Sequence, residues 1–432
     1  MAMAITDATF ITRSLTGRAF STIVTALTVA IAVALMLVLL GMRDAGREAF
    51  ARGTGNMHLL ISREDSALVS ILNNVYYAGA PRRAIDHATV ERLEGSHPWA
   101  WFIPTQIGDS YRGRPVVATT RSFFTDFEPA PGDPWAFERG GLFESAFEVV
   151  VGSAAAGATG LRVGDEISLT HGAPGPGGEL LVGAHTHEEY QFTVVGVLEP
   201  TGSAHDRALF APLEGSWVLH AHDRRLAELG PDAGRTTVDD LTDADRQVTA
   251  IYTRLITRPS REVPANLQQV FSQLRADPSL TVAQPNQEIG RLFRIVGNID
   301  QIIIGLAAVV LVSSGIGILL ALYNTMEQRR RQIALLRVLG ASRGKVFGLV
   351  ITESTVLGLI GAAAGVLLSL VGARIVAAAL YERLGLVIEP GVDPRIVMLV
   401  VVGTLALAAA AGLVPAVSAY RTNVVRNLRP LG

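Results

Sequence analysis

The chain has 432 residues, of which 49% are hydrophobic and 18% are charged, and its mean hydropathy is positive. This composition is too apolar for an ordinary soluble protein and too charged for a protein that lies entirely within a membrane. The net charge of -2 gives no sign of nucleic-acid binding, and the lack of cysteine means that any external domain folds without disulfides.

Four apolar segments are long enough to cross a bilayer, which takes roughly 20 apolar residues. Arg13 and Arg18 precede the first span, Arg421 follows the fourth, and six cations fill segment 324–345 between the second and third. Because such clusters mark cytoplasmic loops, we expect both termini in the cytoplasm and residues 43–298 outside. The first apolar run is too long for a cleaved signal peptide, so we expect a retained anchor.

The predicted fold class is a membrane protein with four transmembrane α-helices and a large α+β extracytoplasmic domain between helices 1 and 2. The expected order is an amphipathic cytoplasmic segment, helix 1, the external core domain, helix 2, a cytoplasmic coupling loop, helix 3, a short external loop, helix 4 and a cytoplasmic tail. The corresponding boundaries are 1–18, 19–42, 43–298, 299–323, 324–345, 346–380, 381–394, 395–420 and 421–432.

Within the external domain, alternating and continuous apolar runs predict strands, and helical periodicity predicts helices between them. Proline, glycine and aromatic residues over 101–140 predict loops between short strands, and 171–183 predicts a flexible loop. An inserted subdomain is expected at about 140–230. The expected strands are 57–62, 149–153, 161–169, 190–198, 250–257 and 280–284, and the expected helices are 84–93, 154–160, 264–274 and 287–300.

The segment between the second and third spans mixes arginines with apolar residues. An apolar cluster at 333–339 predicts a short helix held against the membrane, which Gly340 is placed to stop. This mixture favours a docking surface for an energy-supplying partner. The alternative is that the arginines only set topology and bind anionic headgroups.

The third span contains small residues at close spacing and one acid. Small residues four apart let two helices approach closely, either across a dimer interface or within one chain. Glu353 lies within this span, so we expect it to have a hydrogen-bonding partner or to be protonated; a proton relay is the other alternative. The predicted packing residues are Gly358, Gly361, Gly365 and Ser369.

All nine histidines fall in the external domain. His185 and His187 form one closely spaced pair, and His220 and His222 form another; acids lie near both. Histidines two apart on a strand share a face, and a nearby carboxylate would complete a plausible zinc site. Solvated surface histidines are the alternative. No catalytic serine, cysteine or carboxylate arrangement stands out, so we do not expect an enzyme.

Several segments resemble the FtsX-like permeases of the MacB type, the membrane subunits of ABC systems. Residues 324–326 and 331–342 are similar to the segment that follows the second span in that family, as is Glu353 in the next helix. Residues 411–416 resemble its C-terminal signature. Residues 150–169 with 192–198 resemble its periplasmic core domain.

The resemblance implies a permease that transmits ATP-driven conformational change across a bacterial inner membrane to an external domain. That domain would handle lipoprotein, peptide, drug or metal-related cargo. The chain lacks the phosphate-binding motif of a fused ATPase, so ATP and Mg²⁺ are expected in a separate cytoplasmic P-loop subunit. The residues expected to couple to it are Glu327, Gln328, Arg331, Ile333, Leu335, Leu336, Arg337, Leu339 and Gly340.

The expected partners are this ATPase, a second copy or homologous permease, and a periplasmic or outer-membrane protein, but no nucleic acid. We expect the chain itself to bind no cofactor, unless the histidines bind zinc. Two other functions stay open. One is a regulatory scaffold that controls an external hydrolase, and the other is a membrane-anchored, metal-responsive receptor.

Overall fold

The computed structural model describes residues 7–17, 19–172, 185–230, 234–258, 263–384 and 393–421. The chain forms two compact units, each considered on its own. The membrane unit contains Met1–Ala45, Val296–Ala378 and Glu389–Gly432, and the external unit is built mainly from Gly46–Ile295. Most of the predicted external loop (381–394), tail (421–432) and glycine–proline loop (171–183) lies outside the described residues.

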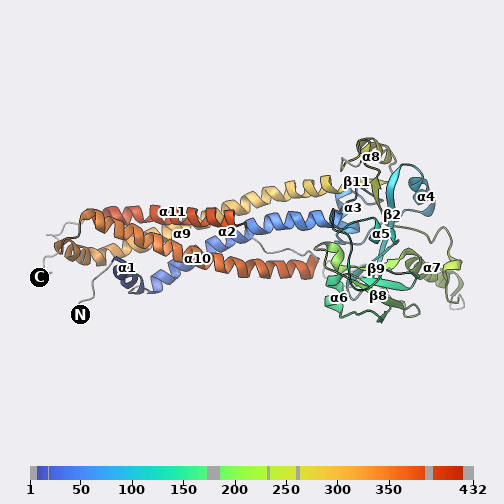
Figure 1. Cartoon of the computed structure of the whole chain (residues 1–432), viewed down its shortest axis with the longest axis horizontal. Coiled ribbons are helices and arrows are strands. Elements are labelled where there is room, and N and C mark those ends of the chain that lie inside the picture. The colour runs from blue at the N-terminus through green and yellow to red at the C-terminus, as the bar shows by residue number, and fades with distance from the viewer. Residues whose placement is uncertain are drawn as a thin grey trace. The chain divides into compact units, whose positions relative to one another are not determined.

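Four long helices carry the predicted membrane spans, and a short one precedes them (Figure 1). Their apolar segments Ala19–Met42, Ile304–Asn324, Arg343–Leu380 and Pro394–Tyr420 are long enough to cross a bilayer, which confirms the four predicted spans. The helices are α1 (Asp7–Thr16), α2 (Ala19–Thr54), α9 (Pro285–Val338), α10 (Arg343–Leu384) and α11 (Pro394–Tyr420).

The four long helices share one apolar core. It includes Val33 and Leu37 of α2, Ile318 of α9, Leu357 of α10 and, from α11, Val400 and Ala408. Many large apolar side chains on the other faces are exposed, as expected of surfaces that meet lipid. The four helices therefore pack around one internal apolar core, and the outer surface of the bundle is also apolar.

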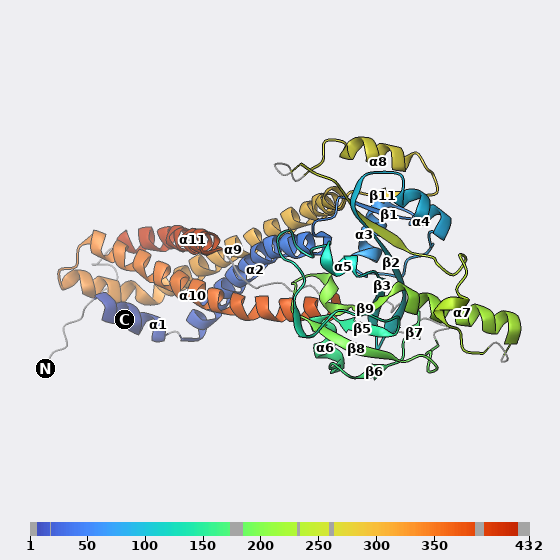
Figure 2. The same ribbon diagram turned by 45° about the vertical axis from the view of Figure 1, so that its right-hand side comes forward.

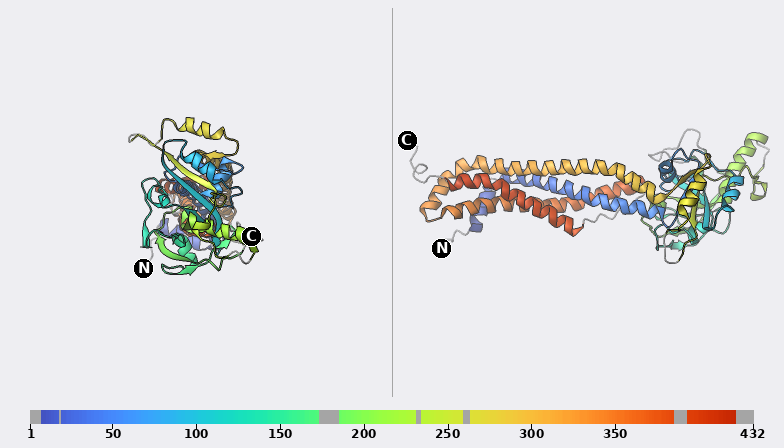
Figure 3. Two further views of the ribbon diagram at one scale, coloured as in Figure 1. Left: turned by 90° about the vertical axis from the view of Figure 1, so that its right-hand side faces the viewer. Right: turned by 90° about the horizontal axis from the view of Figure 1, so that it is seen from above.

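One expectation about these helices was wrong. The coupling segment is not a separate short helix, because α9 runs unbroken from Pro285 to Val338. Figure 3 (right) shows this helix, coloured yellow to orange, as one continuous ribbon. The segment 324–338 contains neither proline nor glycine, so nothing in its sequence interrupts the helix that begins before the span.

The external unit is built on one mixed sheet with the strand order β11-β1-β10-β2-β3-β9-β5-β8-β4. Strand β6 pairs with β8, and β7 pairs with β2. The β3–β9 and β5–β8 pairs are parallel and the others antiparallel. The strands are β1 (Leu59–Ser62), β2 (Trp99–Tyr111), β3 (Arg114–Thr119), β4 (Phe137–Gly140), β5 (Glu148–Val151), β6 (Glu166–Ile167), β7 (Thr170–His171), β8 (Phe192–Leu198), β9 (Leu209–Pro212), β10 (Ala250–Leu255) and β11 (Thr281–Ala283).

Both faces of this sheet are buried, which explains strands that are apolar at every position. In β5, Val150 faces one core while Val149 and Val151 face another, as successive side chains in a strand must. Figure 2 shows α4 and α8 near β1 and β11. The helices of this unit are α3 (Ala67–Asn74), α4 (His87–Glu94), α5 (Ser122–Thr125), α6 (Ser153–Thr159), α7 (Leu213–Leu229) and α8 (Leu267–Arg275).

The predicted split β-α-β unit is present, because β10 and β11 pair with opposite edges of β1 and α8 connects them. The expected loop character of 101–140 was wrong at its start. Trp99–Tyr111 is a long strand, with Pro104 within the ladder. Proline and glycine residues interrupt the alternation of apolar residues that would otherwise identify this strand in the sequence. The region at about 140–230 contributes strands to the same sheet through the β3–β9 pairing.

The last turns of α2 and the first turns of α9 belong to the core of the external unit. The Phe50 ring lies 4.8 Å from Tyr76 and 5.6 Å from Phe293, measured between centroids. The Tyr76 hydroxyl donates to the Phe50 carbonyl oxygen. Ile289 is buried in the same cluster. Both helices are thus packed into the domain at this end instead of being joined to it by loops.

His205 is a fully buried histidine among aromatic rings of this core. Its Nε2 lies 3.0 Å from the Gly53 carbonyl oxygen of α2, and its Nδ1 lies 2.5 Å from the Tyr77 hydroxyl. Both ring nitrogens of the neutral form therefore have partners. Burial lowers the pKa of His205 to about 4, although the bond to Gly53 acts in the opposite direction.

We predict that His205 contributes a loss of about 3 kcal/mol in the stability of the external unit as the pH falls from 6.5 to 4, because only the unfolded chain binds the proton on His205 in that interval. Urea unfolding of the full chain in detergent, followed by tryptophan fluorescence, measures this, since all four tryptophans lie between Trp99 and Trp217. The variant His205→Gln should flatten the dependence. An equal slope in the variant would exclude His205 as its cause.

Candidate functional site

The end of α9 is fixed by a turn of defined geometry. Gly340 has a φ of +97°, which favours glycine. Its N–H donates to the Arg337 carbonyl oxygen at 3.2 Å, and the Ala341 N–H donates to that of Leu336 at 3.0 Å. These two bonds form a Schellman motif. The Ser342 hydroxyl then accepts from the Lys345 N–H at 3.1 Å and caps α10.

The side chains before this turn divide between a buried and an exposed face. Ile333 is buried against Val346 and Val350 of α10 and Ala416 and Ala419 of α11. By contrast, the exposed fractions of Leu335, Val338 and Leu339 are 49%, 62% and 82%. Leu336 and Arg337 are half-buried. The apolar residues Leu335, Val338 and Leu339 form an exposed surface, called here the α9 end surface.

Glu353 is buried within the membrane unit, with a side chain from another helix beside it. The Ser14 hydroxyl of α1 donates to Glu353 Oε1 at 2.5 Å. Thr22 and Thr25 of α2 line the same small cavity, together with Leu322 and Leu357. A hydroxyl-lined cavity provides hydrogen-bond donors for a carboxyl group that is costly to bury alone.

The small residues of α10 lie against two neighbouring helices. A Cβ atom on Gly361 would lie 2.6 Å from Val29 Cβ of α2, and one on Gly365 would lie 2.7 Å from Val33 Cβ. A Cβ on Gly358 would lie 2.5 Å from Ala408 Cβ of α11. Ser369 is buried, and its hydroxyl donates to Val366 of its own helix. These glycines therefore permit close approach within one chain.

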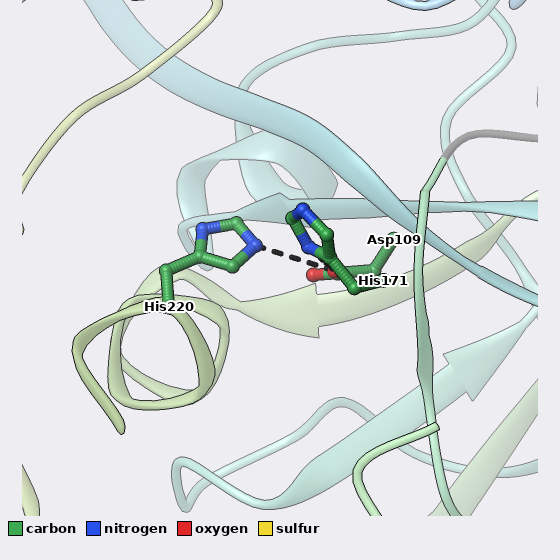
Figure 4. Close-up of side chains that lie close together, drawn as sticks. All are labelled: Asp109, His171 and His220. Carbon is green, nitrogen blue, oxygen red and sulfur yellow. Dashed lines mark hydrogen bonds and ion pairs between the residues drawn. The ribbon is translucent and has the colours of Figure 1, made fainter. Parts of the chain in front are cut away.

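A cluster of histidines and aspartates lies where β2, β7 and α7 meet. Asp109 of β2 and His171 of β7 are register partners in the sheet. Asp109 Oδ1 lies 3.4 Å from His171 Nδ1 and 3.2 Å from His220 Nε2 of α7. Figure 4 shows both rings beside the Asp109 carboxylate. The Ser216 hydroxyl, one turn before His220, donates to Asp109 Oδ2 at 3.1 Å.

A second group adjoins the first. His185 Nε2 lies 3.1 Å from both carboxylate oxygens of Asp223, and His187 Nε2 lies 3.6 Å from Asp223 Oδ2. The ring of His171 lies 5.5 Å from that of His185 and 6.4 Å from that of His187, between centroids. The potential ligand atoms of His171, His187 and Asp223 lie within 4.8 Å of one another.

Asp109 and His220 shift each other's pKa. Burial would raise the pKa of Asp109, but His220 and His171 hold it well below its usual range. Burial would lower the pKa of His220, but the Asp109 carboxylate outweighs this effect and raises it. The two imidazoles thus supply the positive charge that offsets the buried Asp109 carboxylate.

Comparison with known protein families identifies both units. The model for the MacB-like periplasmic core domain matches residues 22–258, more than half of the chain. The model for the FtsX-like permease C-terminal region matches residues 304–424. The chain is an FtsX-like permease with a MacB-like periplasmic core domain. It is therefore a multi-pass membrane protein with an extracytoplasmic domain.

Two relatives of this permease carry related descriptions. An uncharacterized ABC transporter permease of Methanocaldococcus jannaschii is 24% identical over 174 residues, which are 40% of this chain and 43% of that protein. An uncharacterized ABC transporter permease protein of Mycobacterium tuberculosis is 31% identical over 238 residues, 54% of this chain and 23% of that protein. The matched regions thus span less than half the length of either relative.

A solved structure is also similar to the permease. It is the extracellular domain of a noncanonic ABC-type transporter from Gram-positive bacteria. It is 8% identical to this chain and covers 52% of it and 98% of its own length, with a TM-score of 0.27. That score is too low to support any argument about this chain.

The predicted metal-ligand set of the permease was only partly brought together. His185, His187 and His220 lie in the cluster, whereas His222 reaches it only through Glu189, whose Oε1 lies 3.9 Å from His222 Nε2 and 3.2 Å from His187 Nδ1. The Nδ1 of His222 contacts the Thr236 hydroxyl at 3.1 Å. Both His220 and His222 lie on α7, where residues two apart point in different directions. Sequence reasoning missed Asp109, His171 and Asp223, although the spacing of Ser216, His220 and Asp223 on one helix is a usable signal.

The predicted coupling residues of the permease all belong to α9 or to the turn after it. The backbone of Glu327, Gln328 and Arg331 is helical, but their side chains lie outside those that the structure describes. Leu335 and Leu339 are exposed, and Ile333 is buried. The structure therefore separates the apolar segment into residues that hold the bundle together and residues open to a partner.

We predict that Gly361→Ala destabilises the permease by about 1–3 kcal/mol, because the added methyl would overlap Val29 of α2. Gly403→Ala on α11 is the matched control, since no side chain or backbone of another helix lies within 4 Å of its added methyl. Alanine favours a helix over glycine, so the control should be neutral or stabilising. Thermal unfolding in detergent measures both variants. Equal midpoints would contradict the close α2–α10 contact.

Proposed function

We propose that this permease is the membrane subunit of an ABC transporter, which transmits the ATP state of a separate cytoplasmic P-loop ATPase to the external domain. The observation that supports this most is the continuity of α9. One helix carries an exposed apolar surface near its C-terminal end and packs into the external core at its N-terminal end. No loop within it would absorb a displacement.

The α9 end surface is the proposed docking site for the ATPase. Exposed leucines beside arginines suit a groove on a soluble partner, because apolar area provides affinity and charge provides orientation. Leu339 directly follows α9, and its N–H donates to the Leu335 carbonyl oxygen at 3.0 Å, so both leucines lie on one side of the helix end. Ile333 and the turn at Gly340 hold this surface against α10 and α11.

The proposed orientation has both termini and the α9 end surface in the cytoplasm of a bacterial cell, with the external domain across the inner membrane. Cations near the first and fourth spans and around the α9 end support this orientation through the positive-inside rule. A second copy or a homologous permease would complete the transporter. ATP chemistry would belong to the partner ATPase, so this chain would act as a transmitter and not as an enzyme.

The transmission step would be a shift between two arrangements of the bundle. Packed helices respond to force by discrete repacking and not by continuous deformation. The close contacts of Gly361 and Gly365 with α2 allow such a shift, because small residues let helices slide at short distance. The external domain would then act on lipoprotein, peptide, drug or metal-related cargo.

We predict that the Leu335→Glu, Leu339→Glu double variant loses the partner ATPase. Two buried charges would replace two apolar contacts, and the affinity should fall at least tenfold, which corresponds to about 1.4 kcal/mol. The tagged permease is purified in detergent from native membranes, and bound ATPase is identified and its activity assayed. Leu336 is left unchanged because its side chain is half-buried.

Leu229→Glu is the matched control, since Leu229 is 62% exposed and lies on α7 of the external domain. It should bring down the ATPase as the wild type does. If the wild type and the double variant retain equal amounts, the α9 end surface is not the docking site. If no preparation contains a P-loop ATPase, a membrane-anchored receptor becomes the better account.

A further inference from the structure

We propose that the external domain binds one divalent transition-metal ion, with zinc as the representative, through Asp109, His171 and His220. This inference does not rest on the proposed transport function, since the site lies wholly within the external unit. Its test requires no ATPase. The two proposals can therefore fail independently.

The spacing of the three side chains fits a tetrahedral ion. Zinc binds imidazole nitrogen and carboxylate oxygen at about 2.0–2.1 Å, so two ligands of a tetrahedral site lie about 3.3 Å apart. Asp109 Oδ1 lies 3.4 Å from His171 Nδ1 and 3.2 Å from His220 Nε2. Potential ligand atoms of all three residues lie within 4.8 Å of one another. A small movement of the two imidazole rings toward each other would fill three coordination positions of the ion and leave the fourth open.

Two buried nitrogens in the cluster lack hydrogen-bond partners within the described residues. They are His171 Nδ1, which faces Asp109, and His187 Nε2, which faces Asp223. Buried polar atoms are rarely left in this state, because each forfeits hydration without replacement. His187 is completely buried. An ion at Asp109 would give His171 Nδ1 a partner, and it would lie beside the second group.

The neighbours of the three ligands hold them in place. The Gln106 amide N–H donates to His220 Nδ1 at 2.7 Å and directs the opposite nitrogen, Nε2, at Asp109. When an ion binds Nε2, rotation of this amide would let Gln106 Oε1 accept from the Nδ1–H instead. The Ser216 hydroxyl holds Asp109 Oδ2, so Oδ1 remains the oxygen toward the two rings. Contacts of this kind orient metal ligands and raise affinity. Backbone pairing of β2 with β7 fixes the distance between Asp109 and His171.

The donor set selects the class of ion. Two imidazoles and one carboxylate suit zinc and its first-row neighbours, whereas calcium and magnesium prefer oxygen ligands only. The ion would link three elements: β2 through Asp109, β7 through His171 and α7 through His220. It would therefore hold this edge of the external domain together, and occupancy would change its stability.

The test is zinc binding to the full-length permease in detergent after chelator treatment. Competition with a chromophoric zinc chelator should give one zinc per chain, and zinc should raise the midpoint of thermal unfolding. Cobalt in place of zinc should give the visible absorption of a tetrahedral site. His171→Ala should weaken zinc binding at least 100-fold while keeping the metal-free unfolding midpoint, since the His171 side chain is 43% exposed.

His185→Ala is the matched control. Its side chain is 49% exposed, and its ring lies 5.5 Å from that of His171, but it is not among the three proposed ligands. It should change zinc affinity less than threefold. The proposal is overturned if the wild type binds no zinc, or if His185→Ala and His171→Ala weaken binding equally. It is also overturned if His220→Ala leaves the zinc affinity unchanged, which would locate the ion at His171, His187 and Asp223 instead.

Discussion

The account depends on one structural constraint: α2 and α9 do not end where the external domain begins. Phe50 of α2 and Phe293 of α9 pack against each other, and Phe50 also packs against Tyr76. A carbonyl oxygen of α2, that of Gly53, is also the partner of the buried His205. Because these contacts belong to the domain's core, neither helix can shift or rotate at this end without repacking it.

The membrane unit has a corresponding fixed point at the other end of α9. Ile333 packs with residues of α10 and α11. The short Gly340–Ser342 turn, fixed by backbone hydrogen bonds, joins α9 to α10. A partner that displaced the α9 end surface would therefore move three helices together. Between these ends, glycines of α10 let α2 approach closely and give the bundle a contact at which sliding is sterically feasible.

The histidine cluster is a second feature of the external domain. A metal that joins β2, β7 and α7 would stabilise this edge of the external domain. The cluster is distinct from the α2–α9 contact, because its residues lie on other elements of the sheet and on α7. The proposed force transmission and the proposed metal binding thus involve different side chains, and substitutions can address them separately.

Sequence patterns predicted the parts of this fold that depend on local periodicity. The four spans and the β10–α8–β11 unit were predicted, because apolar period and turn residues are local signals. Gly340 was likewise placed at a helix end, and its φ of +97° fits that position. Strand β2 was missed because Pro104 and Gly108 are breakers in most strands.

The candidate metal site needed tertiary information. Asp109 and His171 are far apart in the chain, and only the β2–β7 pairing places them opposite each other. His222 was grouped with His220 on the assumption of strand geometry, and a helix directs the two apart. Likewise, only the packing of α9 on α10 and α11 distinguishes the buried Ile333 from the exposed Leu335.

Hydrogen exchange of the permease in lipid nanodiscs, with its ATPase in nucleotide-free and ATP-trapped states, tests the central claim most directly. If α9 transmits the ATP state, exchange should change in the first turns of α9 (285–295) and in α3, which carries Ile71 of the same core. The change should vanish in the Leu335→Glu, Leu339→Glu variant. Unchanged exchange in these segments, in a complex that hydrolyses ATP, would contradict transmission through α9.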